Sequence, residues 1–107
     1  MDPLSLEQRS QALQAKLEEL LGSRNVYYNP PASVRMSYPA IVFSRSKNEN
    51  RNANNAAYIQ FYRYEVTVID RDPDCEYIST VSRLPMCTFD RHFVSENLHH
   101  TTFTLYY

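Results

Sequence analysis

Glycine is almost absent from this sequence, and its scarcity excludes several kinds of catalytic and nucleotide-binding site. Gly22 is the only glycine among the 107 residues. Loops that bind phosphate through backbone amides need several glycines, as in the patterns GxGxxG and GxxxxGK. The nucleophile elbow of many hydrolases also has glycine on both sides of its serine. We therefore expect neither a nucleotide-binding loop nor a nucleophile elbow in this chain.

Cysteines and long apolar runs are scarce as well. Cys75 and Cys87 form no CxxC pair, which favours a protein made in a reducing cytoplasm over a disulfide framework. No apolar run is long enough to cross a membrane, and the N-terminus does not have the pattern of a secretory signal. The formal net charge is -1, so no strongly basic surface for nucleic acid is indicated.

Residues 57–70 are the most strongly patterned stretch and predict a long central β-strand. The stretch is rich in aromatic and β-branched residues and lacks glycine and proline, a composition that suits a pleated, half-buried surface. Its side chains alternate between two faces, with Tyr62, Tyr64, Val66 and Val68 on one and Arg63, Glu65 and Thr67 on the other. We expect the first face to be buried.

Residues 5–21 predict an amphipathic helix. Ser5 and Gln8 have the spacing of a capping box, and leucines follow near helical spacing. Gly22 stands where a helix favours a left-handed residue after its last turn. We expect the leucine stripe to cover the sheet, and the binding of a partner chain is the alternative.

Shorter patterns complete a single α+β domain over residues 1–107. Strands are predicted at 25–29, 40–44, 87–94 and 101–107. Asp72 and Pro73 fit the start of a second, short helix that ends at Pro85. The predicted fold is a mainly antiparallel sheet with the N-terminal amphipathic helix and the short helix on one face.

Within the strand at 87–94, the alternation places four residues on one face: Cys87, Phe89, Arg91 and Phe93. Residues 45–56, by contrast, have no hydrophobic period and contain five asparagines, which predicts a loop that forms the arm of a hairpin. Two interpretations of this loop stay open. It is either a solvated loop or an arm that becomes ordered against a neighbouring subunit.

An acidic stretch resembles the opening of a calcium-binding loop. Asp70, Asp72 and Asp74 have the right spacing, but the required glycine is absent and Val81 replaces the bidentate glutamate. We therefore interpret the stretch as a turn followed by a helix cap, or as an acidic knuckle that pairs with basic residues of a neighbour.

Three histidines give a second weak indication of a metal. His92 could meet His99 or His100 across a hairpin, but no carboxylate or thiol has convincing spacing from them. No nucleophile, base and orienting group are placed together either. We expect no metal, no cofactor and no enzymatic activity. A small hydrolase or metal-dependent enzyme that uses the acidic and histidine residues is the alternative from another class.

The second half of the chain carries a recognisable pattern. A strand ends in the acidic turn at residues 70–74, and a run of the form LP…FDR…NLHH…F.LYY follows over residues 84–107. This pattern resembles small neck and tail-completion proteins of long-tailed bacteriophages, and among them the tail terminator, or tail-to-head joining protein. The N-terminal helix and the YP.IVF strand fit the same pattern loosely.

The resemblance implies a structural protein of the virion that is made in the host cytoplasm. Such proteins are small α+β domains that form a hexameric ring, which caps the tail tube, stops its growth and docks onto the head connector. The expected partners are copies of the chain, the tail tube protein and a head-closure or connector protein. DNA passes through the ring without sequence-specific binding, and no membrane is involved. Another neck protein is the nearest alternative.

Ten polar residues are the candidates for contacts between subunits or with the tail and connector. They lie in the predicted loop, in the acidic turn and in the strand at 87–94: Arg45, Lys47, Asn50, Arg51, Asp70, Arg71, Asp72, Asp74, Asp90 and Arg91. Exposed ion pairs each contribute less than about 1 kcal/mol, so several have to act together. No catalytic residue or metal ligand is assigned.

Overall fold

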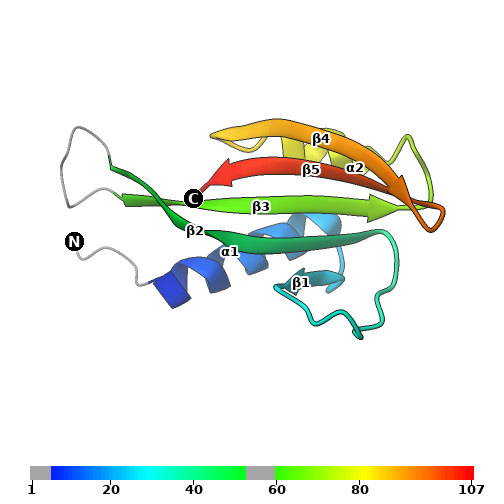
Figure 1. Ribbon diagram of the computed structural model, residues 1–107, viewed down its shortest axis with the longest axis horizontal. Coiled ribbons are helices and arrows are strands. Elements are labelled where there is room, and N and C mark those ends of the chain that lie inside the picture. Colours follow the sequence, from blue (N-terminus) through cyan, green and yellow to red (C-terminus); the bar gives the residue numbers. More distant parts are fainter. Residues whose placement is uncertain (1–5, 53–59) are drawn as a thin grey trace.

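A five-stranded sheet with two helices on one of its faces forms the fold (Figure 1). The computed structural model describes residues 6–52 and 60–107, and the side chains of residues 8–45 and 62–107. The elements follow one another as α1 (Leu6–Leu21), β1 (Val26–Tyr28), β2 (Ala40–Asn52), β3 (Gln60–Asp70), α2 (Glu76–Ser82), β4 (Cys87–Ser95) and β5 (Leu98–Tyr106). The predicted α+β class is confirmed.

The sheet is mixed but mostly antiparallel. Its strand order is β1-β2-β3-β5-β4, so β3 lies in the middle, as predicted, and β1 and β4 are the two edges. Only the pair β1–β2 is parallel, and the other three pairs are antiparallel. Because β4 and β5 form a hairpin beyond β3, the end of the chain lies between its central strand and its β4 edge.

The leucine stripe of α1 covers the sheet, as predicted. Leu13 and Leu17 are both 0% exposed and belong to one core cluster with Tyr64 of β3. Gly22 ends the helix with φ at +74°, and its N–H donates a 2.9 Å hydrogen bond to the carbonyl of Glu18. This is the left-handed position that favours glycine.

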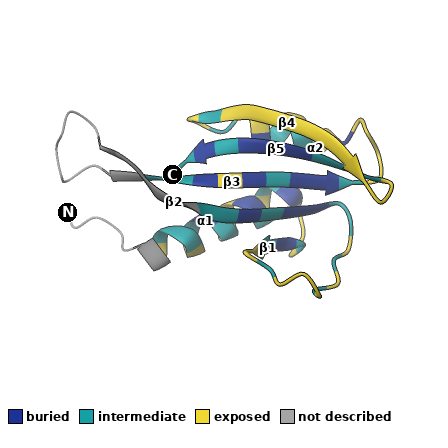
Figure 2. Cartoon of the chain, viewed as in Figure 1, coloured by how far each residue is buried: buried dark blue, intermediate teal, exposed yellow. Residues whose placement is uncertain are grey.

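The two faces of β3 also match the prediction. Tyr64, Val66 and Val68 are buried beneath the helices, where β5 adds Phe103 and Leu105 to the same core (Figure 2). On the opposite face Glu65 is exposed. The central strand therefore fixes which side of every neighbouring strand faces the helices.

The prediction of a loop at 45–56 is wrong for its first part. β2 continues to Asn52, and Asn50–Asn52 pair with Gln60–Tyr62 after a register shift that follows Arg45. Strand pairing uses backbone groups and needs no hydrophobic period, so a polar stretch can continue a hairpin beyond the core. The rest of the predicted loop, residues 53–56, lies outside the part of the chain that the structure describes.

The predicted start of the second helix at Asp72 and Pro73 is also wrong. The helix begins at Glu76, with Cys75 at the N-cap position and no side-chain cap. The carboxylate of Asp72 instead accepts a 2.9 Å hydrogen bond from the N–H of Asp74. Aspartate commonly closes a turn in this way, and the turn here finishes before the helix starts.

A β-bulge at Asp90 overturns the prediction that Cys87, Phe89, Arg91 and Phe93 share a face. Phe89 pairs with Phe103, whereas Arg91 pairs with Thr102, so the register shifts by one residue between them. Phe103 and Thr102 point to opposite faces of β5, and paired residues share a face. Cys87 and Phe89 therefore lie on the helix side of the sheet, and Arg91 and Phe93 lie on the other side.

Candidate functional site

The β4 edge strand is the most exposed element of the fold. Eight of its nine residues are exposed, and only Cys87 is half-buried (Figure 2). Four of the five large hydrophobic side chains found exposed in the described structure lie in β4 or directly before it: Met86, Phe89, Phe93 and Val94. The exposed fractions of Phe89 and Val94 are 58% and 56%. Apolar surface gathered in one place on a monomer commonly marks a contact with another molecule.

The bulge distributes these side chains over both faces of β4. On the helix side, the ring of Phe89 meets that of Phe103 edge to face, with 6.1 Å between their centres. On the other side, Phe93 stacks on His100 with ring centres 4.6 Å apart, and the guanidinium of Arg91 lies 5.5 Å from the Phe93 ring. Each of these two phenylalanine rings therefore meets one ring of β5 and still exposes much of its surface.

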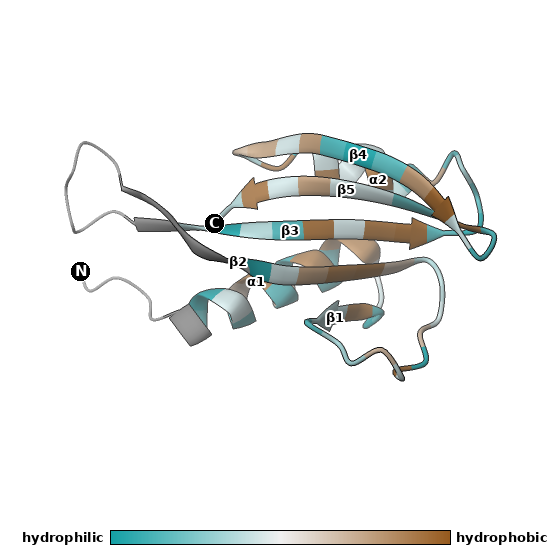
Figure 3. Cartoon of the chain, in the orientation of Figure 1, coloured by the Kyte–Doolittle hydropathy of each residue, from teal (hydrophilic) through white to brown (hydrophobic). Residues whose placement is uncertain are grey.

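The backbone of β4 adds a second kind of binding capacity. An edge strand carries a row of N–H and C=O groups with no neighbouring strand, and another chain can pair with them. The bulge and the charges of Asp90 and Arg91 in the middle of β4 oppose such pairing there. Figure 3 shows apolar sections of β4 on either side of this hydrophilic centre. A partner is therefore expected to engage the two ends of the strand more than its middle.

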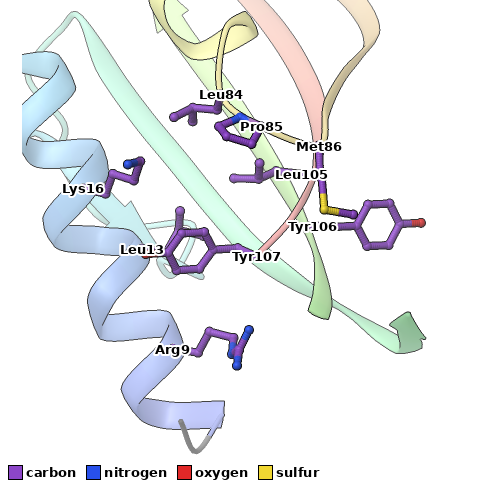
Figure 4. Close-up of a pocket in the computed structure, with 9 residues that line it drawn as sticks. All are labelled: Arg9, Leu13, Lys16, Leu84, Pro85, Met86, Leu105, Tyr106 and Tyr107. Carbon is purple, nitrogen blue, oxygen red and sulfur yellow. The ribbon is translucent and has the colours of Figure 1, made fainter. Parts of the chain in front are cut away.

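A pocket of about 290 Å³ opens between α1 and the segment that precedes β4 (Figure 4). It is lined by Arg9, Leu13 and Lys16 of α1, by residues 84–86 and by residues 105–107. The two helices cover different parts of the sheet, and the pocket lies where neither reaches the end of β5. Its size is at the lower end of the range for small-molecule sites, which fits a few side chains or a small ligand.

The charged side chains among the described residues that line this pocket are both cationic. Arg9 and Lys16 lie on its α1 wall, and none of the described residues that line it is acidic. The guanidinium of Arg9 lies 5.7 Å from the centre of the Tyr62 ring, and its buried Nε atom has no hydrogen-bond partner among the described residues. A buried donor of this kind is costly unless a partner group satisfies it. The pocket is thus apolar with a cationic wall.

Arg45, one of the predicted contact residues, also approaches Tyr62. Its guanidinium is also 5.7 Å from the centre of that ring, and the side chain is half-buried. Arg45 therefore helps to hold Tyr62 through a cation–π contact. The side chains of Lys47, Asn50 and Arg51, which the sequence analysis grouped with it, lie outside the described residues.

The acidic turn at the end of β3 contains four more predicted residues. Asp70 accepts a 2.7 Å hydrogen bond from the N–H of Arg71, whose guanidinium lies 5.9 Å from the centre of the Tyr38 ring. Asp72 and Asp74 are exposed. The turn therefore presents two carboxylates, with Pro73 between them.

The histidines form a pair but not a metal site within the described part of the chain. The Nδ1 atom of His99 lies 3.3 Å from Nε2 of His92, and the rings stack with centres 5.3 Å apart. No group of three or more histidine, cysteine, aspartate or glutamate side chains in residues 8–45 and 62–107 is arranged to hold a metal ion. Two imidazoles alone leave most of a zinc coordination shell unfilled.

The two thiols are poor nucleophiles. Burial raises the pKa of Cys75 and also that of Cys87 above the usual value for cysteine. A backbone hydrogen bond with Tyr77 partly offsets this effect at Cys75. Because the thiolate is the reactive form, a raised pKa lowers reactivity near neutral pH.

The predicted contact residues whose side chains the structure describes thus fall into three separate regions. Arg45 lies near α1, Asp70–Asp74 lie at the far end of β3, and Asp90 and Arg91 lie on the β4 edge. Sequence reasoning missed Arg9 and Lys16, because the pocket joins segments that no local pattern relates. It also missed the exposure of Phe89 and Val94, since nothing in their alternation tells an edge strand from a central one.

Comparisons with known proteins identified no relative of this chain. A scan against models of known protein families found no match for this chain, and neither did a search of curated proteins. Neither of the described helices combines the length and the apolar character needed to cross a membrane.

Proposed function

We propose that this protein is a structural component of the virion of a long-tailed bacteriophage, a tail terminator that binds other proteins and transforms no substrate. Copies of the chain form a closed ring, of six subunits by the sequence resemblance, on the end of the tail tube. The ring stops tube growth and joins the tail to the head connector. DNA passes through it without base-specific contacts.

The single observation that carries this proposal is the exposed β4 strand. A nine-residue edge strand with exposed aromatic side chains on both faces is a surface that folded monomers usually protect. A virion protein, by contrast, uses such a surface in every assembled particle. The sequence pattern at 84–107, which resembles tail-completion proteins, includes this strand.

Particles that lack the protein provide the functional test. A phage with a stop codon in this gene is expected to make tails of excess length, visible by negative-stain electron microscopy, and plasmid-borne protein is expected to restore normal length. Tails of normal length without heads would assign the protein to the head side of the neck instead. Normal particles would contradict the proposal altogether.

The β4 surface is tested with matched variants. Phe89→Ser combined with Val94→Ser removes two exposed apolar side chains and is expected to leave folding intact but to prevent rescue of tail length. Ser79→Asp combined with Ser82→Asp on the exposed side of α2 is the control and should rescue normally. Rescue by the β4 variant would show that this strand is not a contact surface.

A biochemical measurement separates this function from an enzymatic one. Native mass spectrometry of the purified protein, alone and with tail tubes, should show an oligomer or a complex with the tube. Elemental analysis should find no stoichiometric metal. A bound metal whose removal abolishes turnover of a small molecule would favour the enzyme instead.

A further inference from the structure

We propose that the pocket beside α1 receives the acidic turn, residues 70–74, of a second copy of this chain. Subunits would then join head to tail, with a different surface of each molecule on either side of the contact. This inference rests on the proposed function, because it assumes that the chain assembles with itself, and it names the two surfaces that meet.

The pocket offers what such a turn needs. Its wall on α1 carries the positive charges of Arg9 and Lys16, while the exposed side chains of Pro85 and Met86 contribute apolar surface. Within the described part of the chain, no group accepts a hydrogen bond from the buried Nε atom of Arg9. A carboxylate that enters the pocket would pair with the Arg9 guanidinium, and charge-assisted hydrogen bonds of this kind are among the stronger ones in proteins. Figure 4 shows the Arg9 and Lys16 side chains on the helix that borders the pocket.

The turn offers the complementary chemistry. Asp72, Pro73 and Asp74 are all exposed, so an apolar ring is flanked by two carboxylates. Proline has no backbone N–H, so its ring can enter an apolar pocket without burying an unpaired donor at that position. The hydrogen bond from the Asp74 N–H to the Asp72 carboxylate holds the turn in shape before it binds. Less conformational entropy is therefore lost on association.

The pocket and the acidic turn lie at opposite ends of the sheet, so the turn of one molecule cannot enter the pocket of the same molecule. Asp70 pairs with His99 at one end of the β3–β5 ladder, and Arg63 pairs with Tyr106 at the other. Seven residue steps separate these pairs, which corresponds to about 23 Å along the strands. Figure 1 shows the arrowhead of β3, which the turn follows, and the arrowhead of β5 at opposite ends of the sheet. The pocket lies at the second of these ends, because residues 105–107 line it.

A contact between two different ends is heterologous. Repeated from copy to copy it gives a ring if the rotation closes, and a filament if it does not. The β4 strand runs between these ends along one border of the sheet, and none of its residues lines the pocket. It would stay available along the rim of a ring for the tail tube or the connector.

Charge reversal tests the pairing of these surfaces. The pocket variant combines Arg9→Glu with Lys16→Glu, and the turn variant combines Asp72→Lys with Asp74→Lys. Each variant alone then brings like charges together and is expected to lose the oligomer at a concentration where the native chain is fully assembled. An equal mixture of the two variants, or one chain with all four changes, is expected to regain it. Native mass spectrometry gives the readout.

Control variants show whether a loss of assembly is specific to the pocket. Arg24→Glu with Arg35→Glu changes the net charge as much as the pocket variant does, at two exposed sites away from the pocket, and should assemble normally. Since Arg9 is half-buried, Lys16→Glu alone serves as a milder pocket variant, and circular dichroism confirms that each variant is folded. The single change should weaken assembly, and the turn variant should restore it.

Three outcomes would overturn this inference, and only one of them affects the proposed function. Normal assembly of both reversed variants would show that the oligomer uses other surfaces. Loss of assembly in each variant without rescue in the mixture would show that the pocket and the turn do not meet each other. A native chain that stays monomeric, alone and with tail tubes, would contradict the ring and the pairing together.

Discussion

The side-chain oxygens of Ser10 and Tyr64 lie 3.1 Å apart, although 54 positions separate the two residues in the chain. This hydrogen bond joins α1 to the central strand and satisfies the only polar atom of a side chain that is 0% exposed. A buried hydroxyl without a partner costs about 1–3 kcal/mol. The bond therefore fixes the position of α1 over the sheet as well as contributing to stability.

Changes at this pair should lower the free energy of unfolding by small and non-additive amounts. Tyr64→Phe removes the bond and keeps the ring, and we expect a loss of about 1 kcal/mol in urea denaturation. Ser10→Ala should cost at least as much, because it leaves the Tyr64 hydroxyl unpaired. The double variant should cost less than the sum of the two. Strict additivity would show that the two hydroxyls do not interact.

Tyr64 also predicts a loss of stability at alkaline pH. Burial raises the pKa of its phenol above the ordinary value of 10.0, and the Ser10 hydrogen bond only partly opposes this shift. The folded state therefore holds the proton more tightly than the unfolded state. The stabilisation is complete below pH 10, the unfolded pKa, and is lost as the pH rises through the folded pKa. Urea midpoints measured between pH 8 and 11 should fall less steeply in Tyr64→Phe than in the native chain.

The two thiols should react slowly with aromatic disulfide reagents at pH 8. Burial raises the pKa of both, so the fraction of thiolate is small. Cys75 is only 7% exposed and should react more slowly than the half-buried Cys87. Single Cys75→Ser and Cys87→Ser variants separate the two rates, and denaturation in urea should bring both to the rate of free cysteine. Fast reaction of Cys75 in the folded protein would contradict the packing at the start of α2.

The leucine stripe of α1 should be essential for stability. Leu17 is 0% exposed, and Leu17→Ala should lower the free energy of unfolding by about 2–5 kcal/mol because it removes buried methyl groups and leaves a cavity. Glu19→Ala, on the exposed side of the same helix, is the control and should change stability by less than about 0.5 kcal/mol. If the two substitutions changed stability equally in thermal unfolding, α1 would not pack on the sheet as described.

A substitution in the tight turn between β4 and β5 should raise the stability of the protein. Glu96 and Asn97 both have positive φ, at 53° and 65°, a region that is strained for glutamate in particular. Replacement of the pair by Asn-Gly, the sequence that favours such turns, should raise the free energy of unfolding by about 1 kcal/mol. Thermal unfolding measures this gain. A loss of stability would show that the native side chains contribute contacts that outweigh the strain.

Local patterns predicted those parts of the fold that depend on one element at a time. The spacing of Leu13 and Leu17 showed which side of α1 is buried, and the alternation from Tyr62 to Val68 showed which side of β3 faces it. Both features follow from the geometry of a single helix or strand. Register and edge position follow from the neighbours instead, so the bulge at Asp90 and the exposure of β4 were not predictable.

Near the β4 edge, the hydropathy of a residue does not predict whether its side chain is buried. Thr101 and Thr102 are polar yet only 3% and 1% exposed, whereas Phe89 is apolar and 58% exposed. The difference arises because β5 lies between two other strands and β4 does not. The candidate site could not be predicted from the sequence for the same reason, because the pocket beside Arg9 depends on how α1 and the end of β5 approach one another.

The two edge strands of the sheet differ greatly in length, so the two borders of the sheet are not equivalent. β1 provides only three residues at one border, while β4 provides nine at the other. β1 covers only Ile41–Phe43 of β2, so a second molecule at that border would meet two strands in succession, whereas at the other border it would meet the single continuous strand β4. The long border is therefore the more regular surface for a dissimilar neighbour.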